Sequence, residues 1–303
     1  MILKIIDIIN KKILQKIDKV FYKDLDVAYS PIFIIGAPRS GTTLFYQVLC
    51  NYYKIGYLSN MGCLFYGCPV IVEKLIKLLK LNIKIDYKSK YGKTKKLFAP
   101  SECGRFWYRF FKKDKVYLQD SSGVDIKYLR KSVNTLLYIN GGKFVFKNLN
   151  NCLRLLQLNK AFPNAVYLVV KRNTSDNAYS ILKARQELYG DINSWFSVKP
   201  LEYDVLSKLS PEKQVIGQIN STYNLIEKHK NIIGKRKFIT LNYEDFCNDS
   251  EAEMKKIDMF LRKNKIELSR SASIPKMFQK RNIHKGVDLL YKKIKKAKNC
   301  KGE

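Results

Sequence analysis

Hydrophobic residues follow two different spacings along the chain. Short runs of β-branched and aromatic residues, bounded by turn-forming or charged residues, indicate buried strands. The predicted strands are 32–35, 143–147, 165–170 and 237–241. Apolar residues at every third or fourth position indicate helices over 44–49, 70–81, 125–139, 153–162, 175–189, 211–230 and 250–263. Strands that alternate with helices predict an α/β fold, a parallel β-sheet flanked by helices on both faces.

The segments between these elements carry weaker patterns. Residues 57–69 are rich in Gly and Cys and 84–96 are basic, so both are predicted as connections. Residues 98–102 open a helix that carries Phe106, Trp107, Phe110 and Phe111, with Ser101 as its N-cap. Neither a linker nor a repeat interrupts the pattern, and residues 1–303 are therefore predicted as a single domain.

The two ends of the chain differ from its middle. Residues 1–28 place Ile, Leu and Val at helical spacing among Lys and Asp, which predicts an N-terminal amphipathic helix. We expect this helix to pack with its apolar face on its own domain; contact with an anionic membrane surface is the alternative. Residues 269–303 form a Lys-rich, weakly patterned basic C-terminal segment.

Composition narrows the class of protein. With 46% hydrophobic residues the chain can fold around a core, and a formal net charge of +31 indicates an anionic partner. A bias in base composition is an equal explanation of this charge, because the chain is also rich in Ile, Asn and Tyr. The seven cysteines are scattered and no apolar run is long enough to cross a membrane. We therefore expect the cysteines to be reduced thiols in a cytoplasmic protein, and no metal site is predicted. Peripheral contact with the inner face of the membrane is an additional option.

The most informative motif follows the first strand. Residues 36–44 read Gly-Ala-Pro-Arg-Ser-Gly-Thr-Thr-Leu, a tight turn that leads into a helix. A strand, a glycine-containing loop and a helix N-terminus direct backbone N–H groups at one point, which is a binding geometry for phosphate. The loop differs from a P-loop because it lacks the Gly-Lys-Ser/Thr ending. Its candidate binding residues are Arg39, Ser40, Gly41, Thr42 and Thr43.

Two further strands end in candidate binding residues. Arg172 follows the strand that ends at Val170, and Ser180 lies eight residues later on the next helix. A guanidinium group grips two phosphate oxygens at once, which suits Arg172 to an anionic ligand. Lys147 ends the strand that begins at Lys143. The carboxyl ends of parallel strands form the ligand-binding edge of open α/β sheets, so these residues are expected to lie together.

These motifs resemble those of sulfotransferases, in the same order, from about residue 32 to 261. In that family the Pro-Arg-Ser-Gly-Thr-Thr-Leu loop holds the 5′-phosphosulfate of PAPS (3′-phosphoadenosine 5′-phosphosulfate). By the same resemblance, Arg172 and Ser180 would bind its 3′-phosphate and Lys147 would face the transferring sulfuryl group. The chain departs from the family at Asn173-Thr174, where Asp-Pro is usual, and at Asn148-Leu149, where Ser/Thr-Pro is usual. The resemblance implies a P-loop NTPase-like fold and a PAPS-dependent enzyme that releases PAP.

A general base must accept the proton of the acceptor hydroxyl group. Glu102 is the preferred candidate, because its Pro-Ser-Glu segment resembles one in bacterial sulfotransferases. Of the two histidines, His229 is expected to be a surface cation at a helix end, and His284 lies in the basic tail. The carboxylates in reserve are Asp120 and Asp125.

Two later segments complete the set of candidates. Arg281 lies where the family has a basic, glycine-containing loop over the nucleotide, so it is a candidate cofactor contact. Tyr243-Glu244 resembles a family segment after a late strand and is expected to organise the fold.

The resemblance leaves the acceptor open. We expect the acceptor to be a glycan, a lipid-linked saccharide or a small molecule, and an acidic one in view of the protein's positive charge. Nucleic acid is not an expected partner. One rival is a P-loop nucleotide kinase, which predicts a lysine at the end of the loop and an acidic magnesium ligand. The other is a non-enzymatic protein that binds polyanions or a membrane surface through charge alone.

Overall fold

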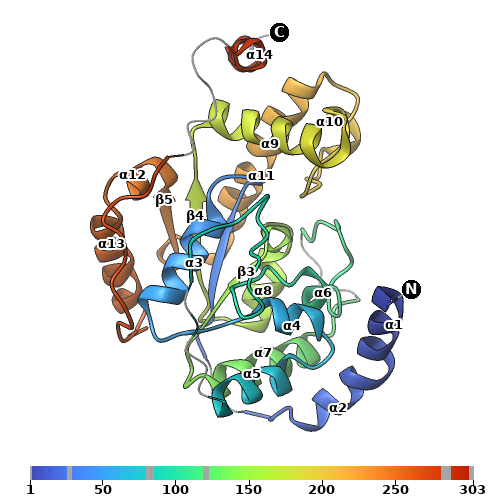
Figure 1. Cartoon of the computed structure of the whole chain (residues 1–303), viewed down its shortest axis with the longest axis vertical. Coiled ribbons are helices and arrows are strands. Elements are labelled where there is room, and N and C mark those ends of the chain that lie inside the picture. Colours follow the sequence, from blue (N-terminus) through green and yellow to red (C-terminus); the bar gives the residue numbers. More distant parts are fainter. Residues whose placement is uncertain are drawn as a thin grey trace.

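A parallel β-sheet forms the centre of the molecule (Figure 1). The structure is a computed structural model that describes residues 2–25, 29–79, 83, 85–118, 123–280 and 288–299. Within these residues the strands run in the order β2-β3-β1-β4-β5, and every pairing is parallel. They are β1 (Ile32–Gly36), β2 (Gly56–Tyr57), β3 (Phe144–Lys147), β4 (Val166–Lys171) and β5 (Phe238–Asn242). All carboxyl ends therefore share one edge of the sheet, as predicted.

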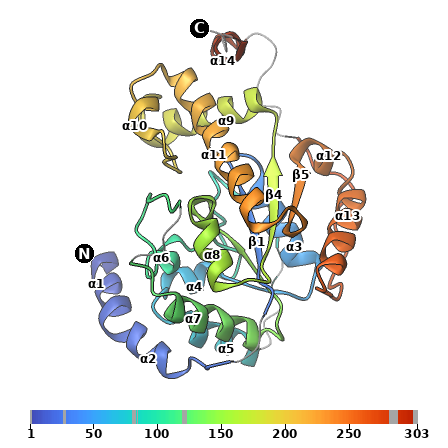
Figure 2. The same cartoon turned by 180° about the vertical axis from the view of Figure 1, so that it is seen from behind.

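Alternate side chains of the strands build two cores, one on each face of the sheet. Phe33 and Ile35 of β1 join one core, and Ile32 and Ile34 join the other. The first core is covered by α5 (Pro69–Leu78), α6 (Gly104–Trp107), α7 (Ile126–Ile139) and α8 (Leu155–Ala161). The second is covered by α3 (Thr42–Tyr52), α12 (Tyr243–Asn248) and α13 (Ser250–Lys263). The predicted arrangement of helices on both faces is confirmed (Figure 2).

A third cluster of helices lies beyond the carboxyl ends of the strands (Figures 1 and 2). It contains α9 (Thr174–Tyr189), α10 (Tyr203–Leu206), α14 (Leu289–Asn299) and the first part of α11 (Pro211–Ile233), whose later residues, such as Ile226, pack in the first core. The helix α14 corrects the prediction of a weakly patterned C-terminal tail. It forms because Ile294 is buried against apolar residues of α9 and α11.

Short elements account for further differences from the prediction, and two of them, β2 and α10, were not predicted at all. The expected connection at 57–69 contains α4 (Asn60–Leu64), which Ser59 caps by accepting a hydrogen bond from the Gly62 amide. The aromatic helix is only the single turn of α6, and its N-cap is Cys103 at φ +43° rather than Ser101. A 3₁₀ turn, Leu149–Arg154, replaces the first residues of the helix predicted at 153–162, and another, Lys235–Lys237, precedes β5.

The N-terminal segment is helical but packs in the opposite sense to the prediction. It consists of α1 (Ile2–Ile9), a π turn (Asn10–Leu14) and α2 (Gln15–Val20). Asn10 and Asp18 are buried against the domain, whereas about half of the surface of Ile5 and Ile13 is exposed. The polar residues face inward because they satisfy backbone groups around α4 and α5. No described helix is both long and apolar enough to cross a membrane.

Candidate functional site

The loop between β1 and α3 is shaped by two close backbone approaches. A Cβ atom on Gly36 would lie 2.5 Å from the carbonyl oxygen of Val170. Gly41 has φ +99°, and a Cβ atom there would lie 2.4 Å from Cδ2 of Tyr243. Only glycine fits such positions. The loop therefore runs tightly along the sheet edge and presents the N-terminus of α3, beginning at Thr42, where backbone N–H groups and the helix dipole favour an anion.

The two segments predicted to bind phosphate meet at Arg39. Its Nε donates a hydrogen bond to Oγ of Ser180 at 3.1 Å, and its carbonyl oxygen accepts one from Nη1 of Arg172 at 3.3 Å. Asn173 stands where the family usually has Asp, and it caps α9 by accepting hydrogen bonds from the amides of Ser175 and Asp176. The helix start is thus preserved, and Ser180 is a buried residue of α9 that contacts the loop through Arg39.

Tyr243 completes this part of the site and was missed as a site residue by the sequence reasoning. Its ring packs on Gly41 and lies beneath the guanidinium of Arg172, whose Cζ is 4.8 Å from the ring centroid. The neighbouring Glu244 accepts a hydrogen bond from the amide of Asn173 at 3.0 Å. Tyr243 thus joins the loop to the arginine. The available signal was its position immediately after a parallel strand, at the edge where ligands bind.

An ion pair between a buried lysine and a partly exposed carboxylate lies at the end of β3. Nζ of Lys147 is bonded to the Glu102 carboxylate and also donates to Oγ1 of Thr43 at 3.2 Å. The Lys147 side chain is 1% exposed, whereas that of Glu102 is 30% exposed. Burial lowers the pKa of the Lys147 ammonium, and the Glu102 carboxylate opposes that decrease. Lys147 is therefore not a solvated strand-end lysine but a buried lysine that pairs with Glu102 inside the site.

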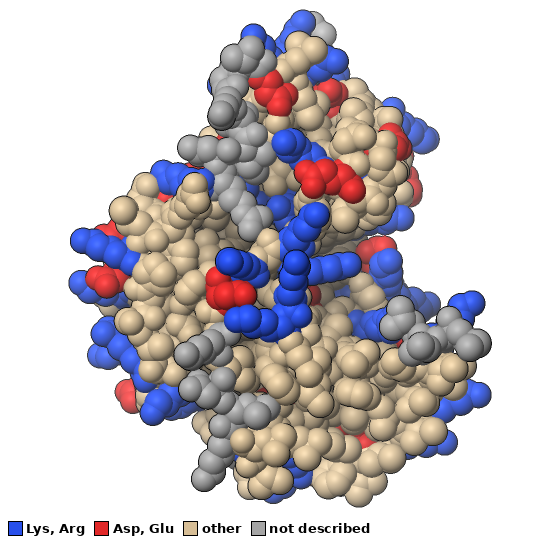
Figure 3. All heavy atoms as spheres, in the orientation of Figure 1, with Lys and Arg blue, Asp and Glu red and all other residues tan. Residues whose placement is uncertain are grey.

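Most of these groups line one cavity of about 470 Å³, whereas Ser180 is buried and is not part of its lining. Arg39, Thr43, Glu102, Lys147 and Arg172 all contribute, and Glu102 is the only acidic residue among its described lining. Figure 3 shows Lys and Arg side chains gathered around a hollow at the centre of this face. An excess of fixed positive charge in a cleft raises the local concentration of anions, so the cavity suits an anionic ligand.

A second cavity, of about 590 Å³, adjoins the first at Glu102 and Tyr91. Its wall contains the aromatic residues Tyr108 and Trp195. It also contains three lysines, Lys93, Lys113 and Lys199. The Glu102 carboxylate thus borders both spaces.

Several predicted residues occupy other places. Ser40 is fully buried, donates its amide to the Ala37 carbonyl and does not line the cavity. Asp125 caps α7 and does not line either cavity. His229 was expected at the surface but is fully buried on α11, and this burial lowers its pKa to about 4. Asp120, Arg281 and His284 lie outside the described residues.

The sequence matches a protein family over most of its length. The sequence model of the sulfotransferase family matches residues 31–263. The chain belongs to the sulfotransferase family. No curated protein matches it closely enough to be considered a relative.

Two solved structures are similar in fold. The sulfotransferase STF9 from Mycobacterium avium is 16% identical with a TM-score of 0.51, covering 78% of this chain and 64% of that one. The sulfotransferase STF1 from Mycobacterium tuberculosis H37Rv is 14% identical, also with a TM-score of 0.51, covering 84% of this chain and 73% of that one. This chain thus spans under two thirds of the length of STF9. At this level of identity, the likeness supports the fold.

Proposed function

We propose that the protein transfers a sulfuryl group from PAPS to a hydroxyl group of an acceptor and releases PAP. The observation that carries this proposal is the meeting of three strand ends at one cavity. Arg39 comes from the loop after β1, Lys147 from β3 and Arg172 from the residue after β4. A P-loop kinase is disfavoured because Arg39, rather than a lysine at the loop end, is the loop's cation.

The residues fit the anionic groups of PAPS. We assign the 5′-phosphosulfate to Arg39 and the start of α3, because N–H groups and a guanidinium there can share several oxygens. We assign the 3′-phosphate to Arg172 and Ser180, with Tyr243 holding the Arg172 guanidinium by stacking. For this contact, the Ser180 hydroxyl group must be shared between Arg39 and the phosphate. Arg281 remains a proposed nucleotide contact outside the described residues.

The chemistry follows from the Glu102–Lys147 pair. When PAPS is bound it supplies the sulfuryl group. Lys147 is kept inside the site and places positive charge where the leaving oxygen becomes negative. Glu102 borders both cavities and accepts the proton of the acceptor hydroxyl group. Because the pair is already formed, the charges need little reorganisation during the reaction.

The acceptor is assigned to the second cavity. Aromatic rings such as Tyr108 and Trp195 offer flat apolar surfaces with polar edges, which suit a saccharide. The three lysines, Lys93, Lys113 and Lys199, exceed by one the two carboxylates of the same wall, Glu102 and Asp114. We therefore propose an acceptor that carries an acidic group, such as an acidic glycan, a lipid-linked saccharide or a charged small molecule.

The release of PAP from PAPS tests the transfer when acidic and neutral saccharides are offered in parallel. We expect release to depend on the acceptor and to favour the acidic one. The double substitution Lys93→Gln/Lys199→Gln should raise KM for the acidic acceptor by about threefold to tenfold, the effect of losing two partly solvated charge contacts. Lys208→Gln, an exposed lysine outside both cavities, is the matched control. An unchanged KM in the double variant would contradict the acceptor assignment, and no acceptor-dependent release would contradict the transfer.

A further inference from the structure

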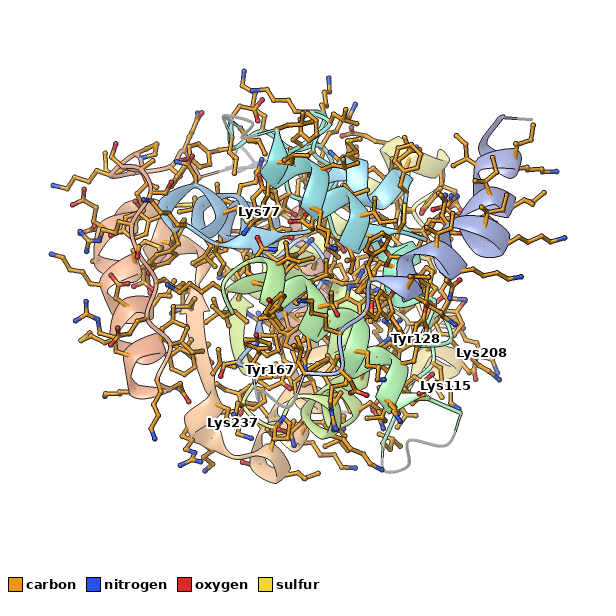
Figure 4. All side chains as sticks on the ribbon, turned by 90° about the horizontal axis from the view of Figure 1, so that it is seen from below. Lys77, Lys115, Tyr128, Tyr167, Lys208 and Lys237 are labelled. Atoms are coloured by element: carbon orange, nitrogen blue, oxygen red, sulfur yellow. The ribbon has the colours of Figure 1, made fainter. Side chains whose placement is uncertain are left out.

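The N-terminal segment, residues 2–20, presents an apolar stripe to solvent. The stripe recurs every four residues, at Ile5, Ile9, Ile13 and Ile17, which are 49%, 38%, 52% and 44% exposed. Val20 is 81% exposed and extends it at the end of α2. Figure 4 shows the side chains of this segment projecting away from the rest of the molecule. Single exposed apolar residues are ordinary, but a continuous helical stripe of this kind indicates a partner.

The opposite side of the segment is attached to the domain by polar contacts. Nδ2 of Asn10 donates to the Leu64 carbonyl at 3.0 Å, and Oδ1 of Asn10 accepts from the Gly67 amide at 2.7 Å. A Cβ atom on Gly67 would lie 2.4 Å from the Asn10 carbonyl oxygen, so the segment packs directly on backbone.

Two more contacts fix the orientation of the segment. Oδ1 of Asp18 accepts from the Ile71 amide at 3.2 Å. Gln15 donates to the hydroxyl group of Tyr128 at 2.8 Å, and Tyr128 is labelled beside the segment in Figure 4. Rotation that buried the isoleucines would break all of these contacts, and the buried polar groups would lose their partners. The stripe is therefore exposed because the fold holds it outward.

The charges beside the stripe are positive. Lys4, Lys12 and Lys16 each precede a residue of the stripe by one position and are exposed. The acidic residues of the segment are engaged elsewhere, because Asp7 pairs with Lys11 at 2.7 Å and Asp18 is buried. An apolar stripe flanked by lysines matches the interface of a bilayer, where acyl chains lie beneath anionic headgroups.

We propose that this stripe docks the protein on an anionic membrane surface. The segment would lie in the plane of the interface, with the isoleucines between the headgroups and the lysines against the lipid phosphates. A second copy of the chain fits less well, because a two-fold interface would bring two rows of lysines toward each other. Docking by this surface does not depend on the proposed transfer reaction.

Co-sedimentation of the full chain with lipid vesicles tests the proposal without PAPS or an acceptor. One set of vesicles is phosphatidylcholine alone, and the other contains added phosphatidylglycerol. We expect binding to the anionic vesicles that weakens with salt, and much weaker binding to the neutral ones. The triple substitution Ile9→Gln/Ile13→Gln/Ile17→Gln should weaken binding to the anionic vesicles at least about tenfold, because three apolar side chains that would insert into the bilayer are removed. Lys12→Gln/Lys16→Gln should remove part of the preference for anionic vesicles.

The matched control is Ile232→Gln/Met259→Gln, which replaces apolar residues 62% and 57% exposed on α11 and α13. It should bind the vesicles as the unsubstituted protein does. The proposal is overturned if the unsubstituted protein does not sediment with anionic vesicles, or if the triple variant binds them equally well. It is also overturned if the protein is a dimer that the triple substitution dissociates, without vesicle binding. Unchanged far-UV circular dichroism verifies that each variant is folded.

Discussion

Asp18 offers the most quantitative prediction. Its carboxylate is buried on α2, where it accepts the amide of Ile71 at the start of α5. Burial raises its pKa from 3.8 to about 6, although the Arg109 guanidinium opposes this rise. The charged carboxylate thus loses part of its hydration, and the Arg109 guanidinium and the hydrogen bond from Ile71 do not fully replace it. Asp18→Asn keeps an oxygen that can accept the Ile71 amide but removes the charge.

The sign of the effect follows from proton linkage. A carboxyl group whose pKa is higher in the folded state than in the unfolded state binds its proton more tightly when folded. Its contribution to stability is complete below pH 3.8 and is lost as the pH rises through about 6. The difference between these pKa values corresponds to a decrease of about 3 kcal/mol in the free energy of unfolding. Asp18→Asn should not show this decrease.

The assay is urea unfolding of both proteins between pH 4 and pH 8, followed by tryptophan fluorescence, which reports on the fully buried Trp107 together with Trp195. Urea is uncharged and does not screen the carboxylate. The difference between the two unfolding curves isolates Asp18 from Glu73, whose pKa burial raises to about 7. As the pH rises, the free energy of unfolding of Asp18→Asn should increase relative to that of the unsubstituted protein, by about 3 kcal/mol in total. A difference that stays constant with pH would refute the reasoning.

Three further substitutions address the site. Gly41→Ala should weaken PAP binding at least about tenfold, because the loop must move away from the Tyr243 ring. The control Gly190→Ala, at φ +73° in open space, should lower the free energy of unfolding by about 1 kcal/mol without changing PAP affinity. If calorimetry finds the same PAP affinity for Gly41→Ala and the unsubstituted protein, this prediction is wrong. Glu102→Gln removes both the proposed base and the charge that supports the Lys147 ammonium, so the rate of PAP release should fall at least about a hundredfold. The pKa of Lys147 should also fall further, so the alkaline limb of the residual rate profile should move to lower pH, and an unmoved limb would argue against Lys147 as the required cation. Arg172→Lys keeps the charge but loses the planar guanidinium that stacks on Tyr243, so the preference for PAP over ADP should fall about tenfold in competition binding. An unchanged preference would exclude Arg172 from the 3′-phosphate site.

The sequence was most informative where structure is determined locally. The strand before Gly36 and the turn that follows it were predicted from a few adjacent residues, and α13 was predicted at both ends. The positions of Arg172 and Ser180 followed from the strand end and the helical spacing. In each case the pattern and its cause lie within one helix, one strand or the turn that joins them.

Contacts between distant residues could not be predicted in this way. Lys147 pairs with Glu102, 45 residues earlier in the chain, and nothing in its own strand indicates that partner. Asn10 and Asp18 face inward because Gly67 and Ile71, more than fifty residues later, need hydrogen-bond acceptors. Amphipathic spacing identified the N-terminal helix, but the choice of the buried side depended on these tertiary contacts.

Calorimetric titration with PAP and with ADP tests the central claim most directly. Each nucleotide carries two phosphate groups, but ADP has both at the 5′ position and only PAP has one at the 3′ position, which Arg172 and Ser180 are proposed to bind. We expect PAP to bind more tightly by roughly 2–4 kcal/mol at moderate salt, the range for charge-assisted hydrogen bonds to a phosphate in a partly buried site. Equal affinity for PAP and ADP, or salt-sensitive binding of any polyanion without such a preference, would contradict the proposed donor site.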